Sequence, residues 1–96
     1  MRSLARNLIR DSRIRTTVAK AKELRPYVEK LVTKAKINTV ASRRTINSRL
    51  QGVTETKKLF DVVAPKYTER KGGYIRIIRL GNRDLDGSPM ALIEFV

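Results

Sequence analysis

The chain has 96 residues, a length that suits one domain over residues 1–96 with a modest hydrophobic core. Its 22 Lys and Arg residues outnumber 9 Asp and Glu residues, and the net charge of +13 opposes compaction unless a polyanion neutralises it. Because the chain has no Cys and no His, it offers no disulfide, no thiolate ligand and no imidazole base. No apolar run approaches the roughly 20 residues that span a bilayer.

The positive charge is concentrated in the first half of the chain. Residues 1–50 hold 14 basic and 3 acidic residues, a net charge of +11, whereas residues 51–96 hold 8 and 6, a net charge of +2. We therefore expect the first half to supply the main electrostatic surface for a polyanion. A second concentration lies in residues 66–71, directly before a predicted strand.

A short amphipathic helix is predicted over residues 3–11. Ser3 is a candidate N-cap, and Leu4, Leu8 and Ile9 fall on one face of this helix. A basic, amphipathic start is also typical of a removable transit peptide. We favour the helix as part of the fold, because its apolar residues suit the elements that follow.

A brief strand and a long helix come next. The sequence RIRTT, residues 13–17, is alternating and β-branched, which predicts an edge strand. Thr17 is then a candidate N-cap for a helix over residues 18–36, in which apolar residues recur at helical spacing. Pro26 lies inside this pattern and predicts a kink in one helix, since the periodicity continues across it.

Two shorter helices are predicted in the middle of the chain. The third covers residues 40–50 and ends at Gln51-Gly52. Thr54 is a candidate N-cap for the fourth, which covers about residues 55–64. Pro65 is expected to stop this helix.

Two strands complete the predicted fold. They cover residues 74–80 and 90–96, and Glu94 is expected to lie near Arg76 or Arg79 across the pair. The order is helix-strand-helix-helix-helix-strand-strand. It predicts an α+β protein with a small sheet packed against helices.

The residues give little support to an enzyme. Without His, the commonest general base near neutral pH is missing. Asp84 and Asp86 could be a metal-binding pair, but the Asp86-Gly87 sequence favours a turn in which Asp bonds its own backbone. Gly72-Gly73 lacks a following Lys-Ser or Lys-Thr and is no phosphate-binding loop of the nucleotide-hydrolase kind. We expect no catalytic residue, cofactor, metal or small-molecule substrate.

The basic residues instead predict contacts with nucleic acid. Arginine dominates the start of the chain, and its planar fork suits phosphate oxygens. For any single cation the alternative is a solvated surface charge, which we favour for Lys30, while Arg49 adds to the positive field. The predicted RNA-binding residues are Arg2, Arg6, Arg10, Arg13, Arg15, Lys20, Lys22, Lys34, Lys36, Arg43, Arg44, Lys66, Arg70 and Lys71.

The stretch KYTERKGGYIRI, residues 66–77, brings cations, tyrosines and a glycine pair together. The glycines would let the backbone approach a phosphate closely. Tyr67 or Tyr74 could stack on a splayed base, as in readers of single-stranded RNA. For both we favour the alternative, a ring half-buried against the core with its hydroxyl exposed.

Several motifs together resemble one known family. They are TTVAKAKELRPYVEKLVTKAK, ASRR, KLFDVVAPKY, KGGYIRI and PMALIEFV, in this order along the chain. In these segments the chain resembles the bacterial-type large-subunit ribosomal protein seventeen family over nearly its whole length. Family members usually carry a further basic, His-containing lead before the first helix, and whether such a lead precedes this chain stays open.

The resemblance implies an α+β structural constituent of the large ribosomal subunit, with no catalysis. It implies contacts with large-subunit ribosomal RNA near the mouth of the peptide exit tunnel and with neighbouring ribosomal proteins. The expected location is a ribosome in the cytoplasm, with an organellar ribosome as an open alternative. By position, the implied RNA contacts are the basic residues of the first helix and strand, Lys20, Lys22, Arg43, Arg44 and the loop 66–71.

Two other functions remain as alternatives. A free-standing DNA- or RNA-binding protein, such as a nucleoid protein or RNA chaperone, would have the same charge without accompanying ribosomes. A membrane-surface protein could use the basic first helix, but that helix is short and has no Trp or Phe.

Overall fold

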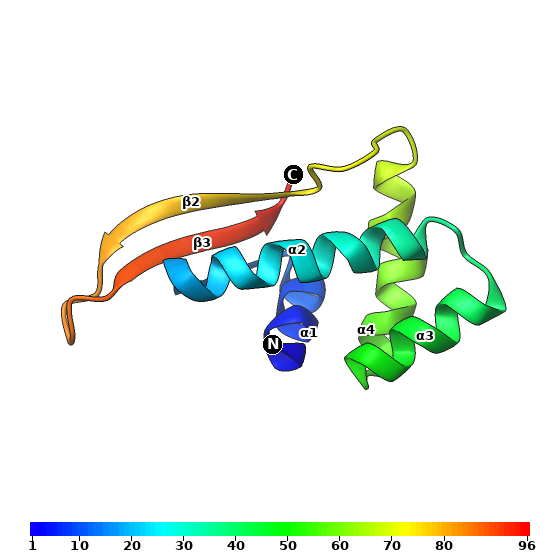
Figure 1. Cartoon of the computed structure of the whole chain (residues 1–96), viewed down its shortest axis with the longest axis horizontal. Helices are drawn as coiled ribbons and strands as arrows, with labels where there is room; N and C mark the ends of the chain where they lie inside the picture. The colour runs from blue at the N-terminus through cyan, green and yellow to red at the C-terminus, as the bar shows by residue number, and fades with distance from the viewer.

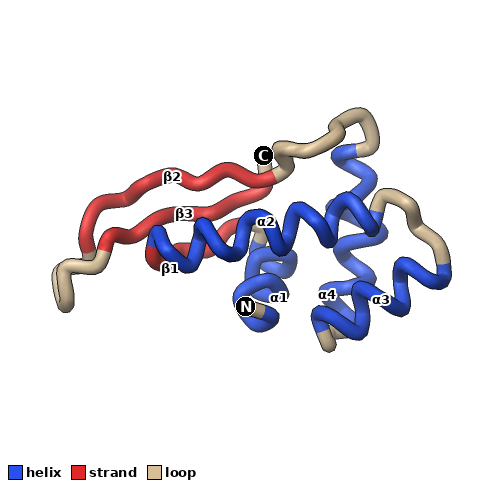
Figure 2. Tube along the Cα trace, viewed as in Figure 1, coloured by secondary structure: helices blue, strands red, loops and turns tan.

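A three-stranded antiparallel sheet packs against a long central helix in the computed structural model, which describes all of residues 1–96 (Figures 1 and 2). The molecule is elongated, with extents of 45 × 27 × 18 Å. The β2–β3 hairpin reaches one end of the molecule, and α3 and α4 lie at the other (Figure 1). The elements are α1 (Arg2–Asp11), β1 (Arg13–Thr17), α2 (Val18–Ala35), α3 (Val40–Leu50), α4 (Val53–Lys58), β2 (Ile75–Asn82) and β3 (Pro89–Phe95). The predicted α+β class and element order are confirmed.

Helix α1 begins at Arg2, one residue earlier than the sequence predicts. Met1 is the N-cap and makes no side-chain cap bond, so the prediction that Ser3 caps the helix is wrong. Ser3 instead lies within the first turn, where its Oγ accepts a hydrogen bond from Arg6 Nη2 at 3.4 Å. The helix ends at Ser12, which has a φ of 71° and donates its N–H to Leu8 O at 2.8 Å.

Helix α2 is one continuous helix, as its apolar periodicity predicts. Thr17 Oγ1 accepts a hydrogen bond from Lys20 N at 3.3 Å, which confirms the predicted N-cap. The helix continues through Pro26, whose ring is exposed to solvent. Its buried residues are Val18, Ala21, Leu24, Val28, Leu31, Val32 and Ala35, and they form the centre of the core.

The fourth helix differs from its prediction at both ends. Gly52 is the N-cap of α4 and Thr54 makes no cap bond. The chain then continues through a π-helical segment, Leu59–Val63, into a 3-10 turn, Ala64–Tyr67, that contains Pro65. Pro65 does not end the helical path because it sits in the first turn of a new segment, where a missing N–H costs little.

Strand β3 is the centre of the sheet, which has the order β1-β3-β2. This arrangement makes β1 an edge strand, as predicted. Both neighbours run antiparallel to β3, so that Arg13 and Arg76 both face Glu94. Arg76 Nε lies 2.6 Å from Glu94 Oε1, which confirms the expected cross-strand pair.

The inner face of the sheet packs on α2 and α1. Ile75 and Ile93 are buried there with Leu8 and Ile9 of α1, and Tyr74 is fully buried just before β2. Burial of each large apolar side chain contributes roughly 1.5–3 kcal/mol, which offsets the chain entropy lost on ordering. The sheet and the helices therefore share one core.

The β2–β3 turn agrees with the turn interpretation of the Asp pair. Gly87 has a φ of 73°, and Asp86 Oδ1 accepts a hydrogen bond from Ser88 N at 3.1 Å. Arg83 Nη2 donates to Asp86 Oδ2 at 2.8 Å, and this bond together with that from Ser88 lowers the pKa of Asp86. Asp86 thus organises the turn.

Candidate nucleic-acid interface

The predicted RNA-binding residues separate into two groups in the structure. In the first group the charged head is held by another part of the chain. In the second it makes no hydrogen bond and no ion pair. The held residues are Arg2, Arg6, Arg10, Lys36, Arg43 and Arg70. The unpaired residues are Arg13, Arg15, Lys20, Lys22, Lys34, Arg44, Lys66 and Lys71.

Arg2 and Arg6 hold the C-terminal end of α3. Arg2 Nε donates to Arg49 O at 3.1 Å and Arg6 Nη1 donates to Leu50 O at 2.8 Å. The last carbonyls of a helix have no partner within it, and its C-terminus carries partial negative charge, so both bonds stabilise α3. A Cβ at Gly52 would lie 2.9 Å from Arg6 Cδ, so this glycine leaves room for the Arg6 side chain.

The end of α1 is held in a similar way. Lys58 Nζ donates to Arg10 O at 2.6 Å, which places a cation at this second helix C-terminus. The Arg10 guanidinium pairs with the neighbouring Asp11 carboxylate at 3.0 Å and lowers the pKa of Asp11. Both members of this pair are exposed, so water screens their attraction.

Lys36 and Arg70 hold the loop that follows the 3-10 turn. Lys36 Nζ donates to Arg70 O and lies 3.1 Å from Tyr74 Oη. Arg70 Nη1 donates to Gly73 O at 3.1 Å. Their charges therefore shape this loop from within the chain.

Tyr67 and Tyr74 are predicted either to stack on a base or to be half-buried with an exposed hydroxyl, and both predictions are wrong. Tyr67 and Tyr74 are buried, with ring centroids 5.1 Å apart, so they are not free to stack on a base. Their hydroxyls are not exposed either: Tyr67 Oη donates to Val96 O at 2.8 Å, and Tyr74 Oη donates to Arg70 O at 3.2 Å. Burial raises the pKa of Tyr67.

Unpaired cations gather around a groove of about 580 Å³ that crosses α2, here called the α2 groove. Lys30 and Lys34 line it from α2, Arg49 from α3 and Lys71 from the loop before β2. The only acidic residue in the lining is Glu29, whose Oε1 accepts a hydrogen bond from Tyr74 N at 2.9 Å. The α2 groove thus has an excess of positive charge that no part of the chain neutralises.

Two cations of the α2 groove, Lys30 and Arg49, are not among the predicted contacts. Lys30 is expected to be a solvated charge, yet it lies in the lining beside Lys34. Their spacing of four residues on a helix places them on one face, and this signal is present in the sequence. Arg49 reaches the groove only through the packing of α3 on α2, for which the sequence offers no local signal.

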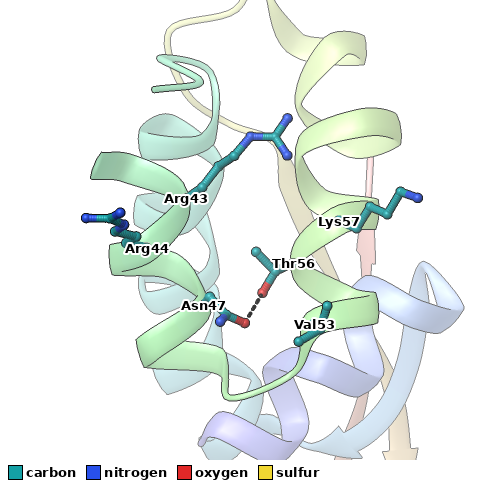
Figure 3. A pocket seen from close by; sticks show the side chains of 6 residues that line it. All are labelled: Arg43, Arg44, Asn47, Val53, Thr56 and Lys57. Atoms are coloured by element: carbon teal, nitrogen blue, oxygen red, sulfur yellow. Dashed lines mark hydrogen bonds between the residues drawn. The ribbon is translucent and has the colours of Figure 1, made fainter. Parts of the chain in front are cut away.

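A second groove, of about 370 Å³, lies between α3 and α4 (Figure 3). We call it the α3–α4 groove. Its lining residues are Arg43, Arg44, Asn47, Val53, Thr56 and Lys57. None of these side chains is acidic, and Arg44 and Lys57 are unpaired. The structure therefore brings two predicted residues, Arg43 and Arg44, together with the unpredicted Lys57.

Other kinds of site have little support in the structure. It contains no group of three or more His, Cys, Asp or Glu side chains that could hold a metal ion. No helix is both long enough and apolar enough to span a membrane. The chemistry that the surface offers is the binding of anionic oxygens by guanidinium and ammonium groups.

Comparison with known proteins gives the family. The profile described as ribosomal protein L17 matches residues 1–96, which is the whole chain. The chain belongs to the ribosomal protein L17 family. The family resemblance of the motifs is thereby confirmed. Because L17 family members are structural components rather than enzymes, the prediction of a non-enzyme is also confirmed.

Curated relatives support the same assignment. The large ribosomal subunit protein bL17 of Sphingopyxis alaskensis is 56% identical over 95 residues, which cover 99% of this chain and 68% of the relative. The protein of the same name from Zymomonas mobilis is 55% identical over 93% of this chain and 64% of its own length. The one from Akkermansia muciniphila is 52% identical over 94% of this chain and 66% of its own length. The chain thus spans about two thirds of the length of these L17 relatives. Their names and the family support a structural protein of the large ribosomal subunit.

Proposed function

We propose that this chain binds large-subunit ribosomal RNA as a structural constituent of the large ribosomal subunit, near the mouth of the peptide exit tunnel. Its location would be the ribosome in the bacterial cytoplasm. The L17 family assignment supports the subunit. The main support for RNA binding is that unpaired cations from α2, α3 and the loop before β2 line the α2 groove together.

The proposed mechanism is neutralisation of phosphate charge on a preformed surface. Lys34 and Lys71 come from segments far apart in the sequence, and both line the α2 groove. Phosphates of one RNA segment bound there would release counterions, so binding would weaken steeply as salt rises. Contacts of this kind position RNA without reading its sequence.

The held cations have a different proposed role, which is to keep this surface in shape. Arg2 and Arg6 fix the end of α3, and Lys36 fixes the loop before β2. Arg49 and Lys71 lie on those two parts of the chain. The held residues would therefore support RNA binding indirectly.

The sheet offers a surface for neighbouring ribosomal proteins. Ile78 and Leu80 are exposed on β2, with 41% and 45% of their surface accessible. Exposed apolar side chains on a sheet are typical of protein contacts when they form a contiguous patch. This surface is separate from the cations of the α2 groove.

Sedimentation tests the proposed function. We expect a tagged chain expressed in bacteria to comigrate with the large subunit through a sucrose gradient in high-salt buffer, near one copy per particle. A chain that stays at the top of the gradient, yet binds many RNAs and DNAs alike at low salt, would contradict the proposal. That result would favour a free-standing nucleic-acid-binding protein.

A further inference from the structure

The α3–α4 groove is an open, basic groove between two helices. Its two walls, α3 and α4, are joined by Gln51 and Gly52 (Figure 3). Its volume of about 370 Å³ lies in the range of about 300–1,000 Å³ that is typical of sites for small organic ligands. Arg44 projects from α3 and Lys57 from α4, both toward the outer side of their helix, so an unpaired cation lies beyond each wall of the groove (Figure 3).

Arg43 is held in place at one end of this groove. Its Nε donates to Asn38 Oδ1 at 2.9 Å, its Nη2 lies 3.7 Å from Asp61 Oδ1, and its guanidinium carbon lies 4.8 Å from the centre of the Phe60 ring. The side chain projects from α3 into the space between the helices (Figure 3). Because it is ordered before any ligand arrives, a ligand that packs on it loses less entropy on binding. A planar guanidinium is a surface on which RNA bases stack.

The middle of the groove combines polar and apolar groups. Thr56 Oγ1 donates to Gly52 O at 2.7 Å and lies 3.4 Å from Asn47 Oδ1. The Asn47 amide nitrogen has no partner in the chain and is free to bond the edge of a base. Val53, with 75% of its surface exposed, offers an apolar contact beside it.

We propose that the α3–α4 groove binds one unpaired nucleotide of an RNA strand. The base would enter between the helices and pack on Arg43, and the Asn47 amide would bond its edge. The phosphates on either side of the nucleotide would contact Arg44 and Lys57. This inference rests on the proposed RNA-binding function and adds to it a site for an unstacked nucleotide.

An RNA strand fits these features better than an acidic peptide does. A strand carries a phosphate on each side of every nucleotide, and the groove has an unpaired cation on each side. A carboxylate-rich peptide would use these cations but would have no aromatic ring to stack on Arg43. RNA bases in bulges and loops are the ones free to enter such a site.

The test compares two RNA hairpins that differ only by one bulged nucleotide in the stem. We expect the full chain to bind the bulged hairpin about tenfold more tightly, an effect within the range that stacking of one base supplies. Val53→Glu should abolish this preference, because it puts a carboxylate in the groove. Thr54→Glu is the matched control: it adds the same charge to the same exposed helix turn outside the lining, and it should keep the preference.

Both substitutions are compatible with folding, since an acidic residue in the first turn of a helix is favourable. Arg43→Lys provides a second variant that keeps the charge and loses the planar group. It should lower the preference for the bulge without changing affinity for the paired hairpin, and circular dichroism would check the fold of each variant.

Three results would overturn the inference. The first is equal binding of both hairpins by the unaltered chain. The second is an equal loss of preference in Val53→Glu and Thr54→Glu. The third is a groove that binds a polyglutamate peptide in a Val53-dependent way while showing no preference for the bulge. Failure to bind either hairpin, or any ribosomal RNA, would instead overturn the proposed function and this inference with it.

Discussion

Helix α1 and the α2 groove are both rich in basic residues, but their charges have different surroundings. In α1 the arginines at positions 2, 6 and 10 are held by Arg49 O, Leu50 O and Asp11. Around the α2 groove, Lys30, Lys34, Arg49 and Lys71 have unpaired side chains. The density of charge along a sequence therefore differs from the charge that a folded surface offers to a ligand.

The difference comes from where the ends of the helices lie. Helix α1 packs beside the C-terminal end of α3, whose free carbonyls attract cations. The α2 groove is lined by α2, the end of α3 and the loop before β2, and none of its cationic side chains bonds a backbone carbonyl. Cations there have only solvent, or a ligand, as a partner.

The largest effect is expected from removing a held cation. Arg6→Ala leaves Leu50 O without its donor and should lower the free energy of unfolding by about 1–3 kcal/mol. For a domain of this size each kcal/mol corresponds to a fall in Tm of roughly 4–8 °C. Thermal unfolding followed by circular dichroism measures this change.

Arg13→Ala is the control for that prediction, since Arg13 is exposed and unpaired. Its Tm should stay close to that of the unaltered chain. Equal stability of the two variants would show that α1 does not hold α3 in solution, and the comparison between the two regions would fail.

A moderate effect is expected at the loop before β2. Lys36→Met keeps the length of the side chain but removes the donor to Arg70 O and Tyr74 Oη. We expect a loss of about 1 kcal/mol in the free energy of unfolding, measured by urea titration. Cleavage within residues 68–73 by a protease should also become faster. If the variant has the same free energy of unfolding and the same rate of cleavage as the unaltered chain, Lys36 does not stabilise the loop in solution.

The sequence predicts most of the fold because its signals are local. Thr17 and the apolar periodicity after it predict the start and the buried face of α2. The predicted strand pair brings Glu94 near Arg76 or Arg79, and the structure shows that Arg76 is the partner. The prediction that Pro65 ends the fourth helix is wrong, because a π-helical segment comes before it and a 3-10 turn that contains Pro65 follows directly. Leu59, Phe60 and Val63 of the π-helical segment are buried in the core, and local sequence rules do not describe such packing.

The candidate site was predictable only in part. The spacing of Lys30 and Lys34 predicts a shared helix face, which can be seen without a structure. The bonds from Arg2 and Arg6 to the end of α3 join residues 47 and 44 positions apart. Nothing in the sequence near Arg6 shows that its guanidinium bonds the end of another helix. Identifying unpaired cations therefore requires the tertiary structure.

The smallest effect is expected from acid at the hairpin turn, where Arg83 is held by Asp86. The hydrogen bond from Arg83 lowers the pKa of Asp86, so the stabilisation from this pair is complete above the ordinary pKa of the carboxyl. It is lost as the pH falls below about 4 and through the lowered value. The protection of the Gly87 and Ser88 amides against exchange, relative to an unfolded peptide at the same pH, should fall only in that acidic range. A fall in protection already at pH 5 to 6 would mean that the pair does not hold the turn.

The salt dependence of RNA binding tests the central claim most directly. Affinity for large-subunit ribosomal RNA would be measured over a series of salt concentrations for Lys34→Ala/Lys71→Ala and for Arg6→Ala, at a temperature where both are folded. The account predicts that the log-log slope falls by about one unit per lost phosphate contact in the double variant and is unchanged in Arg6→Ala. An unchanged slope in the double variant, or an equal fall in Arg6→Ala, would contradict the division into unpaired and held cations.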